Sequence, residues 1–294
     1  MTAPRILVHR DTELMARATA ARLVRALADA QTARGTASVV LTGGRNGNAL
    51  LAALAASPDR DAVDWARLDV WWGDERFLPG GDPDRNEVQA REALLDAVGV
   101  DPARVHPMPA ADGPHGAGES GGADGGAGDG GDGTEAAVAG AAEAYARELA
   151  EAAGAADEHG PAAVPAFDVL LLGVGPDTHV ASLFPELSAV RETERTVVGV
   201  HGAPKPPPVR ISLTLPAIRA AREVWLLAAG EDKAGAVARA LTATGEIQVP
   251  AAGARGTERT LWLLDRAAAA RLPEGVTAEE AAPEDAAASP PGSG

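Results

Sequence analysis

The sequence contains no cysteine, which excludes disulfide bonds, thiolate zinc sites, iron–sulfur clusters and cysteine nucleophiles. It also has no apolar run long enough to cross a bilayer, and no apolar leader follows Met1–Arg5. We therefore expect a cytoplasmic protein that has no membrane partner. With 294 residues, 46% of them hydrophobic, the chain can fold around a core of its own.

Positive charge is scarce, because 26 Lys and Arg face 42 Asp and Glu, for a formal net charge of −16. Most of the excess lies in two segments. Residues 110–160 hold eleven acidic side chains and one basic one, Arg147, and residues 272–294 hold five acidic side chains and no Lys or Arg. The rest of the chain is nearly neutral, which indicates solvated acidic segments and no basic face for nucleic acid.

Several familiar catalytic and nucleotide-binding motifs are missing. There is no H-E-x-x-H, and the six histidines are scattered, so we predict neither a metal nor a cofactor. A G-x-S-x-G nucleophile elbow and a P-loop are absent too. The segment Gly173–Thr178 reads G-x-G-x-x-T, and the missing third glycine weakens a dinucleotide-binding interpretation.

Apolar runs of strand length alternate with helix-like stretches, a pattern typical of an α/β protein with a parallel sheet. The continuous runs Val169–Leu172 and Val224–Leu227 indicate strands covered on both faces. We expect helices at about Asp11–Ala30 and Ala49–Ala55, and a third that begins at Asp84 and is capped by it. The expected strands are Arg5–His9, Ser38–Thr42, Leu68–Trp72, Phe167–Gly173, Thr196–Val200, Glu223–Ala229 and Leu261–Leu264.

One α/β domain is expected over residues 1–276, because the strand pattern resumes after a Gly/Asp-rich insertion at about 110–133. That insertion has almost nothing to bury and cannot offset the entropy of ordering it. The acidic residues 277–294 end in Ser-Pro-Pro-Gly-Ser-Gly. We predict that the insertion and this tail are disordered.

Asp177 and His179 follow the buried strand Phe167–Gly173. In open α/β sheets the ligand crevice lies at the carboxyl ends of the strands. A histidine there can stay neutral near pH 7 and take a proton from water, while a nearby carboxylate orients it. A loop histidine that only caps a helix is an equally good interpretation of the local sequence.

A second polar cluster, Asp74-Glu75-Arg76, follows the strand Leu68–Trp72. Adjacent charges beside a buried strand are costly unless they pair or meet a ligand. Arg76 could clamp a phosphate or a carboxylate, because its planar fork donates two hydrogen bonds at once. Asp74 or Glu75 could hold that guanidinium, and a purely structural ion pair is the alternative.

Two further segments suit an anionic ligand and a third is rich in proline, and each also has a plainer interpretation. The turn Gly43–Asn46 precedes a helix and offers free backbone N–H groups, although two glycines often make only a turn. Lys233 opens a helix, where it either pairs locally or faces an anion. The stretch Pro204–Pro208 is either a ligand for a proline-reading domain or a rigid wall of the site.

Taken together, these segments resemble the 6-phosphogluconolactonase family over about Arg5 to Arg271, apart from the insertion. The resemblance implies a Rossmann-like parallel-sheet sandwich with helices on both faces, of the sugar-phosphate isomerase/deaminase type and without a nucleotide. The blocks that carry it, in the family's order, are Trp72-Gly73-Asp74-Glu75-Arg76-Phe77 with Asp84 and Asn86, Gly175-Pro176-Asp177-Thr178-His179 with Ala181-Ser182-Leu183-Phe184-Pro185, Pro204-Lys205-Pro206-Pro207 with Arg210, and Glu231-Asp232-Lys233-Ala234.

The resemblance also implies a function, namely hydrolysis of 6-phospho-D-glucono-1,5-lactone to 6-phosphogluconate in the oxidative pentose phosphate pathway. The partner it implies is this small-molecule lactone, and we expect the chain to be a monomer. His179 would be the general base that activates water, Asp177 would tune it, and Asp74 is a further catalytic candidate. The implied substrate- and phosphate-binding residues are Gly43, Gly44, Arg45, Asn46, Arg76, Lys205, Arg210 and Lys233.

Two residues depart from the family's pattern. Arg45 stands where a hydroxyl residue is usual, and Thr178 stands where glycine is usual, although threonine tolerates a positive φ poorly. One alternative is a glucosamine-6-phosphate deaminase-like isomerase, for which Asn-Glu-Pro is expected where this chain has Ser182-Leu183-Phe184-Pro185. The other is a non-catalytic sugar-phosphate-binding protein, in which Arg45 and Thr178 mark a lost activity.

Overall fold

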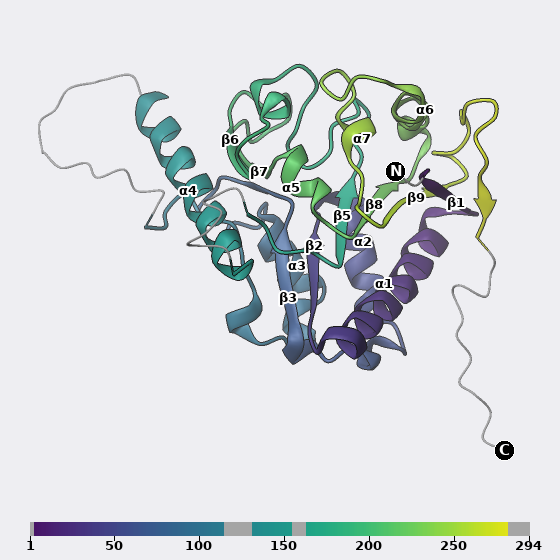
Figure 1. Ribbon diagram of the computed structural model, residues 1–294, viewed down its shortest axis with the longest axis horizontal. Helices are drawn as coiled ribbons and strands as arrows, with labels where there is room; N and C mark the ends of the chain where they lie inside the picture. The colour runs from purple at the N-terminus through teal and green to yellow at the C-terminus, as the bar shows by residue number, and fades with distance from the viewer. Residues whose placement is uncertain (1–2, 115–130, 155–162, 282–294) are drawn as a thin grey trace, which may run out of the picture.

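The computed structural model describes residues 3–114, 131–154 and 163–281 (Figure 1). Its helices are α1 (Thr12–Arg34), α2 (Gly44–Ala55), α3 (Asn86–Ala93), α4 (Gly131–Ala152), α5 (Leu215–Arg219), α6 (Ala234–Thr242) and α7 (Pro250–Gly253). Its strands are β1 (Arg5–His9), β2 (Ala37–Leu41), β3 (Leu68–Trp72), β4 (Asp74–Arg76), β5 (Val169–Gly173), β6 (Val197–Val200), β7 (Arg210–Leu213), β8 (Glu223–Ala228), β9 (Arg259–Asp265) and β10 (Glu279–Glu280).

A 7-stranded sheet in the order β10-β1-β9-β8-β5-β2-β3 forms the centre of the fold, and its neighbouring strands all pair in parallel. A second, 3-stranded sheet in the order β4-β7-β6 is antiparallel. The parallel α/β architecture predicted from the sequence is confirmed. The short strand β4 was not predicted, because its three residues are all charged and carry no apolar pattern.

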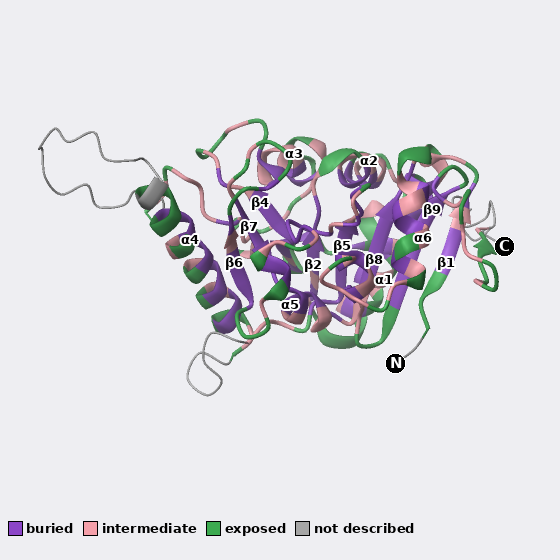
Figure 2. Cartoon of the chain, turned by 90° about the horizontal axis from the view of Figure 1, so that it is seen from above, coloured by how far each residue is buried: buried purple, intermediate pink, exposed green. Residues whose placement is uncertain are grey.

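Helices cover both faces of the large sheet, as the continuous apolar strands predicted (Figure 2). One core lies between the sheet and helices α1, α2 and α3, and it includes Leu23, Leu50 and Trp72. The other lies on the opposite face, reaches the small sheet and helices α4 to α7, and includes Trp71. Adjacent residues of β3 thus enter different cores, because successive side chains of a strand point to opposite faces. Among the described residues, no helix is long and apolar enough to span a membrane.

Helices α2 and α3 begin at residues other than the predicted ones. Helix α2 starts at Gly44, five residues before the expected Ala49, so the glycine turn forms the first helical turn itself. Helix α3 starts at Asn86, and its N-cap position makes no side-chain cap hydrogen bond. The predicted cap by Asp84 is wrong, because the carboxylate of Glu75, from β4, accepts the free N–H groups of this helix instead.

The segments predicted to be disordered lie largely outside the described residues, at 115–130 and 282–294. At the edge of the insertion, the amide of Gly80 donates to Asp112 at 2.7 Å. Within the predicted tail, Glu279 and Glu280 form β10 beside β1, and Glu279 pairs with Arg5 at 2.7 Å. Order therefore extends into both segments, and the disorder of the remainder stays a prediction.

Edge strand β3 is joined to helix α4 through His106. Its imidazole stacks on the indole of Trp71, with 3.8 Å between the ring centroids. Its Nδ1 lies 2.7 Å from Glu148, and its Nε2 lies 3.7 Å from Asp69, which is itself paired with Arg104 at 2.8 Å. Burial lowers the pKa of His106, but the hydrogen bonds and charges of Asp69 and Glu148 outweigh burial and raise the pKa to about 9.

The raised pKa of His106 predicts a pH-dependent contribution to stability. Because the pKa rises from 6.5 to about 9 on folding, the contribution is complete below pH 6.5 and is lost as the pH rises through 9. We expect this to lower the free energy of unfolding by about 2 kcal/mol between those pH values, after allowance for solvent screening. Urea unfolding of wild type and His106→Gln checks this, with the exposed His201 changed to Gln as the control. A pH dependence that is unchanged in His106→Gln contradicts the prediction.

Candidate active site

The candidate active site lies where the chain leaves two neighbouring parallel strands in opposite directions. Strand β2 continues through α2 to β3 on one side, whereas β5 continues towards β8 on the other. The carboxyl ends of such strands leave a crevice between their outgoing loops. A pocket of about 440 Å³ opens there, between the turn at Gly43 and the loop that carries His179.

The structure brings the sequence-predicted site residues together around this pocket. Asp177 lies behind the imidazole of His179, to which it is hydrogen-bonded. The pocket also has lining residues that the sequence did not single out as site residues, among them Thr42, Asn86 and Asp232. The predicted site residues that line it are Gly43, Gly44, Arg45, Asn46, Asp74, Arg76, His179, Lys205, Arg210 and Lys233. Their roles in chemistry stay predictions.

His179 and Asp177 form a short hydrogen bond, with 2.5 Å between Nδ1 and the carboxylate Oδ1. The imidazole ring also lies against the ring of Phe184, with ring centroids 4.5 Å apart. Burial would raise the pKa of Asp177, but the hydrogen bond and charge of His179, together with the charge of Lys205, lower it to about 2. The carboxylate is therefore ionised near neutral pH and fixes Nδ1, which leaves Nε2 as the nitrogen available to a water or a ligand.

The backbone of this loop makes room for the pair at Gly175. A Cβ added there would lie 2.0 Å from Nδ1 of His179 and 2.4 Å from the carboxylate of Asp177, so only glycine is compatible with the hydrogen bond. Thr178 adopts a φ of 81°, and its carbonyl accepts a hydrogen bond from the amide of Ala251 at 3.0 Å. Thr178 thus takes the left-handed backbone that glycine adopts more easily, at a cost in strain.

Arg45, Lys205 and Lys233 line the pocket together, and two of them lie near Asp232. Nζ of Lys233 lies 3.6 Å from its carboxylate and the guanidinium of Arg45 lies 3.8 Å from it. Burial lowers the pKa of Lys233, and the charges of Lys205 and Arg45 lower it further, whereas Asp232 raises it. An anion placed beside Lys233 would favour its charged form and oppose this shift.

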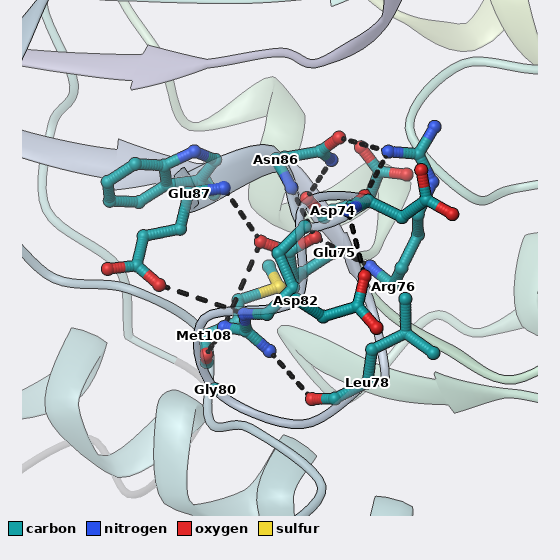
Figure 3. A network of polar contacts seen from close by, with 12 residues as sticks. Asp74, Glu75, Arg76, Leu78, Gly80, Asp82, Asn86, Glu87 and Met108 are labelled. Carbon is teal, nitrogen blue, oxygen red and sulfur yellow. Dashed lines mark hydrogen bonds and ion pairs between the residues drawn. The ribbon is translucent and has the colours of Figure 1, made fainter. Parts of the chain in front are cut away.

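On the small sheet, Asp74 and Arg76 of β4 line the pocket, and Figure 3 shows the polar contacts around them. Asp74 is buried, and its Oδ2 accepts a hydrogen bond from Ser182 at 2.6 Å. The guanidinium of Arg76 donates to the backbone carbonyl of Asp84, and to the side chain of Asn86 at 3.2 Å. Sequence reasoning did not assign a role to Asn86, although its place at the start of α3, just after a polar cluster, was a signal.

Arg210 shapes the wall of the pocket. Its Nε donates to the carbonyl of Pro207 at 3.1 Å, and its Nη2 donates to those of Lys205 and Pro206. Its guanidinium lies 5.8 Å from the centre of the Phe184 ring, and burial lowers its pKa. The proline-rich stretch is therefore wrapped around an arginine of the site, which favours the rigid-wall interpretation.

A metal centre has no evident set of ligands in the described part of the chain. Within residues 3–114, 131–154 and 163–281, no group of three or more His, Asp or Glu side chains is placed to hold a metal ion.

A family model described as glucosamine-6-phosphate isomerases/6-phosphogluconolactonase matches residues 10–262. The chain therefore belongs to this family of sugar-phosphate enzymes. It is 67% identical over 273 residues to the 6-phosphogluconolactonase of Streptomyces coelicolor, covering 93% of this chain and 96% of that one. It is 47% identical to the 6-phosphogluconolactonase of Mycobacterium tuberculosis, with 91% and 98% covered. The solved 6-phosphogluconolactonase of Trypanosoma brucei, 28% identical, superposes with a TM-score of 0.73 over 93% of this chain and all of that one.

The strained threonine beside the candidate base gives a stability prediction. Thr178→Gly removes a left-handed β-branched residue and a buried hydroxyl that lacks a hydrogen-bond partner. We expect a gain in the free energy of unfolding of about 1 kcal/mol, net of the greater chain entropy of glycine. Thr178→Ala removes the same hydroxyl but keeps Cβ, so it should gain less. Urea unfolding of both variants checks this, and equal stabilities would show that backbone strain is not the cause.

Proposed function

We propose that this chain hydrolyses 6-phospho-D-glucono-1,5-lactone to 6-phosphogluconate, using a water activated by His179. The observation that carries the proposal is an imidazole at the pocket, with Nδ1 fixed by an ionised carboxylate and with several cations lining the same cavity. The relatives named 6-phosphogluconolactonase support it through their identity and coverage.

The proposed reaction needs a general base and cations that hold the phosphate of the substrate. It does not pass through a covalent enzyme intermediate. Nε2 of His179 takes a proton from a water whose oxygen attacks the lactone carbonyl. The tetrahedral oxyanion that forms then collapses, and the bond between the carbonyl carbon and the ring oxygen breaks. The imidazolium returns its proton to that ring oxygen, which becomes a hydroxyl. The carboxylic acid formed at the other end gives its remaining proton to solvent, so the product leaves as a carboxylate. Asp177 stays ionised throughout and stabilises the imidazolium.

Positioning of the substrate falls to the cations of the pocket. A sugar phosphate carries its charge at one end, so basic groups can hold that end while the carbonyl lies near His179. Arg76, Lys233 and the first turn of α2 are the proposed anchor, because all three line the cavity and a helix N-terminus offers free N–H groups to an anion. Lactones also open slowly in water, so general-base help of about 10²–10⁴-fold together with positioning suffices.

The proposal extends to the setting of the enzyme. It is a cytoplasmic monomer of the oxidative pentose phosphate pathway whose partner is the small-molecule lactone, without nucleic acid, a membrane or a cofactor. Arg45, the third residue of the turn Gly43–Asn46, still lines the pocket, which supports a substrate-binding site over one that has lost its activity.

Removal of the base tests the proposal most simply. We expect His179→Ala to lower kcat on freshly prepared 6-phosphogluconolactone by about 10²–10⁴-fold, with little change in KM, because the anchoring cations remain. The assay follows acid release and subtracts spontaneous ring opening. His201→Ala, in an exposed position, is the matched control, and ammonia release from glucosamine 6-phosphate tests for deaminase activity in parallel. An undiminished rate in His179→Ala would reject the mechanism.

Removal of Arg76 should act on binding in the first place. Arg76→Ala deletes a charged donor at the pocket, so we expect KM to rise by about 10- to 100-fold while kcat falls much less. Steady-state kinetics over a wide range of lactone concentrations separates the two parameters. A fall in kcat at constant KM would instead place Arg76 at the reacting carbonyl.

A further inference from the structure

Side chains along β4 alternate between the pocket and the protein interior. Asp74 and Arg76 line the pocket, whereas Glu75, between them, points the other way and is fully buried. This follows from the strand itself, because successive side chains leave opposite faces. A buried carboxylate one residue from a ligand-facing arginine needs partners of its own.

Glu75 finds those partners at the start of helix α3 (Figure 3). Its Oε1 accepts the amides of Arg76 at 2.8 Å and Asn86 at 2.7 Å, and its Oε2 accepts the amide of Glu87 at 2.9 Å. It therefore does what an N-cap residue does, but from a different element. Burial raises the pKa of Glu75, and the charge of Arg85 and these amides oppose that shift.

The buried guanidinium of Arg85 supplies the positive charge opposite the carboxylate of Glu75. Its Nη2 lies 3.8 Å from the carboxylate of Glu75, and both side chains are 1% exposed. The same guanidinium donates to the carbonyl of Met108 at 2.7 Å and to that of Leu78 at 3.3 Å. The pair thus holds the loop between β4 and α3 in place, and with it the first residue of α3.

Asn86, held in this way, makes hydrogen bonds with both pocket-lining residues of β4, Asp74 and Arg76. Its Nδ2 donates to the backbone carbonyl of Asp74 at 2.8 Å, and its Oδ1 accepts from Nη1 of Arg76 at 3.2 Å. Gly43 leaves the room this requires, because a Cβ there would lie 1.9 Å from Oδ1 of Asn86. Asn86 and the carbonyl of Asp84 both engage Nη1 of Arg76.

We propose that Asn86, fixed by the buried carboxylate of Glu75, is a positioning residue that holds the guanidinium of Arg76 towards the substrate. A long arginine side chain otherwise samples many rotamers, and binding must then order it. Asn86 restricts Arg76 before the substrate arrives, so its contribution reaches the substrate through Arg76. The inference rests on the proposed function, since it assumes that Arg76 binds the lactone.

A double-mutant cycle on KM tests this relay. We expect Asn86→Ala alone to raise KM for the lactone about tenfold with a small change in kcat. Added to Arg76→Ala, the same change should raise KM no further, because the group it positions is gone. Multiplying effects would overturn the proposal and show direct contact between Asn86 and the substrate, and an unchanged KM in Asn86→Ala alone would also overturn it.

A conservative variant separates positioning from loss of structure. Asn86→Asp keeps the acceptor oxygen for Arg76 but loses the Nδ2 donor to the carbonyl of Asp74, so we expect its KM to lie between those of wild type and Asn86→Ala. If Asn86 bound the substrate phosphate itself, the added negative charge would raise KM more than Asn86→Ala does, which would contradict the inference.

Two further variants complete the design. Gln89→Ala is the control. Gln89 is hydrogen-bonded to Asn48 and to the carbonyl of Pro83 and does not contact Arg76, so its removal should leave KM unchanged.

Glu75→Gln should raise KM in the wild-type background but not in Arg76→Ala, and an additive effect would contradict its place in the relay. Thermal unfolding identifies any variant that fails to fold. If the proposed function itself is wrong, wild type shows no lactone turnover, an outcome distinct from every result above.

Discussion

The hydrogen bond between Asp177 and Nδ1 of His179 is the contact on which the proposed chemistry depends. It measures 2.5 Å, and it exists only because Gly175 has no side chain to fill the same space. The carboxylate that makes it is held ionised, with a pKa of about 2. An imidazole oriented in this way has its second nitrogen free for the pocket, as a general base requires.

The backbone strain at Thr178 and the repulsion among the cations of the pocket both occur near this contact, and the rest of the fold stabilises the chain against them. The left-handed Thr178 is held by the amide of Ala251 in α7. In the same pocket, burial and the charges of Lys205 and Arg45 lower the pKa of Lys233. Cations are brought this close by strands and helices packed on two apolar cores. Under the proposed function, these cations are held in place before the substrate arrives, so the substrate need not assemble the site.

The sequence predicted the parts of this arrangement that depend on local pattern. Continuous apolar runs such as Val169–Leu172 identified doubly covered parallel strands, and the polar residues just beyond them identified the pocket side of the sheet. The resemblance to a known family, carried by four short blocks, extended this to the candidate residues, all of which gather at one cavity or directly behind it.

Contacts between residues that are distant in the sequence could not be predicted from local pattern. The sequence offered Asp84 as the cap of α3, but the cap is Glu75, because burial and pairing with Arg85 place that carboxylate under the helix. It could not show that Gly43 leaves room for Asn86. Threonine at position 178 argued locally against a left-handed backbone, yet the tertiary contact to Ala251 outweighs that preference. In each case tertiary packing overrides a local rule.

A crystal structure with 6-phosphogluconate bound tests the central claim most directly, because the product retains both ends of the substrate. The account predicts that the carboxylate carbon of the product lies within one water molecule's reach of Nε2 of His179, with its phosphate among the cations of the same pocket. A product bound with its carboxylate far from His179, or outside the pocket altogether, would contradict the account.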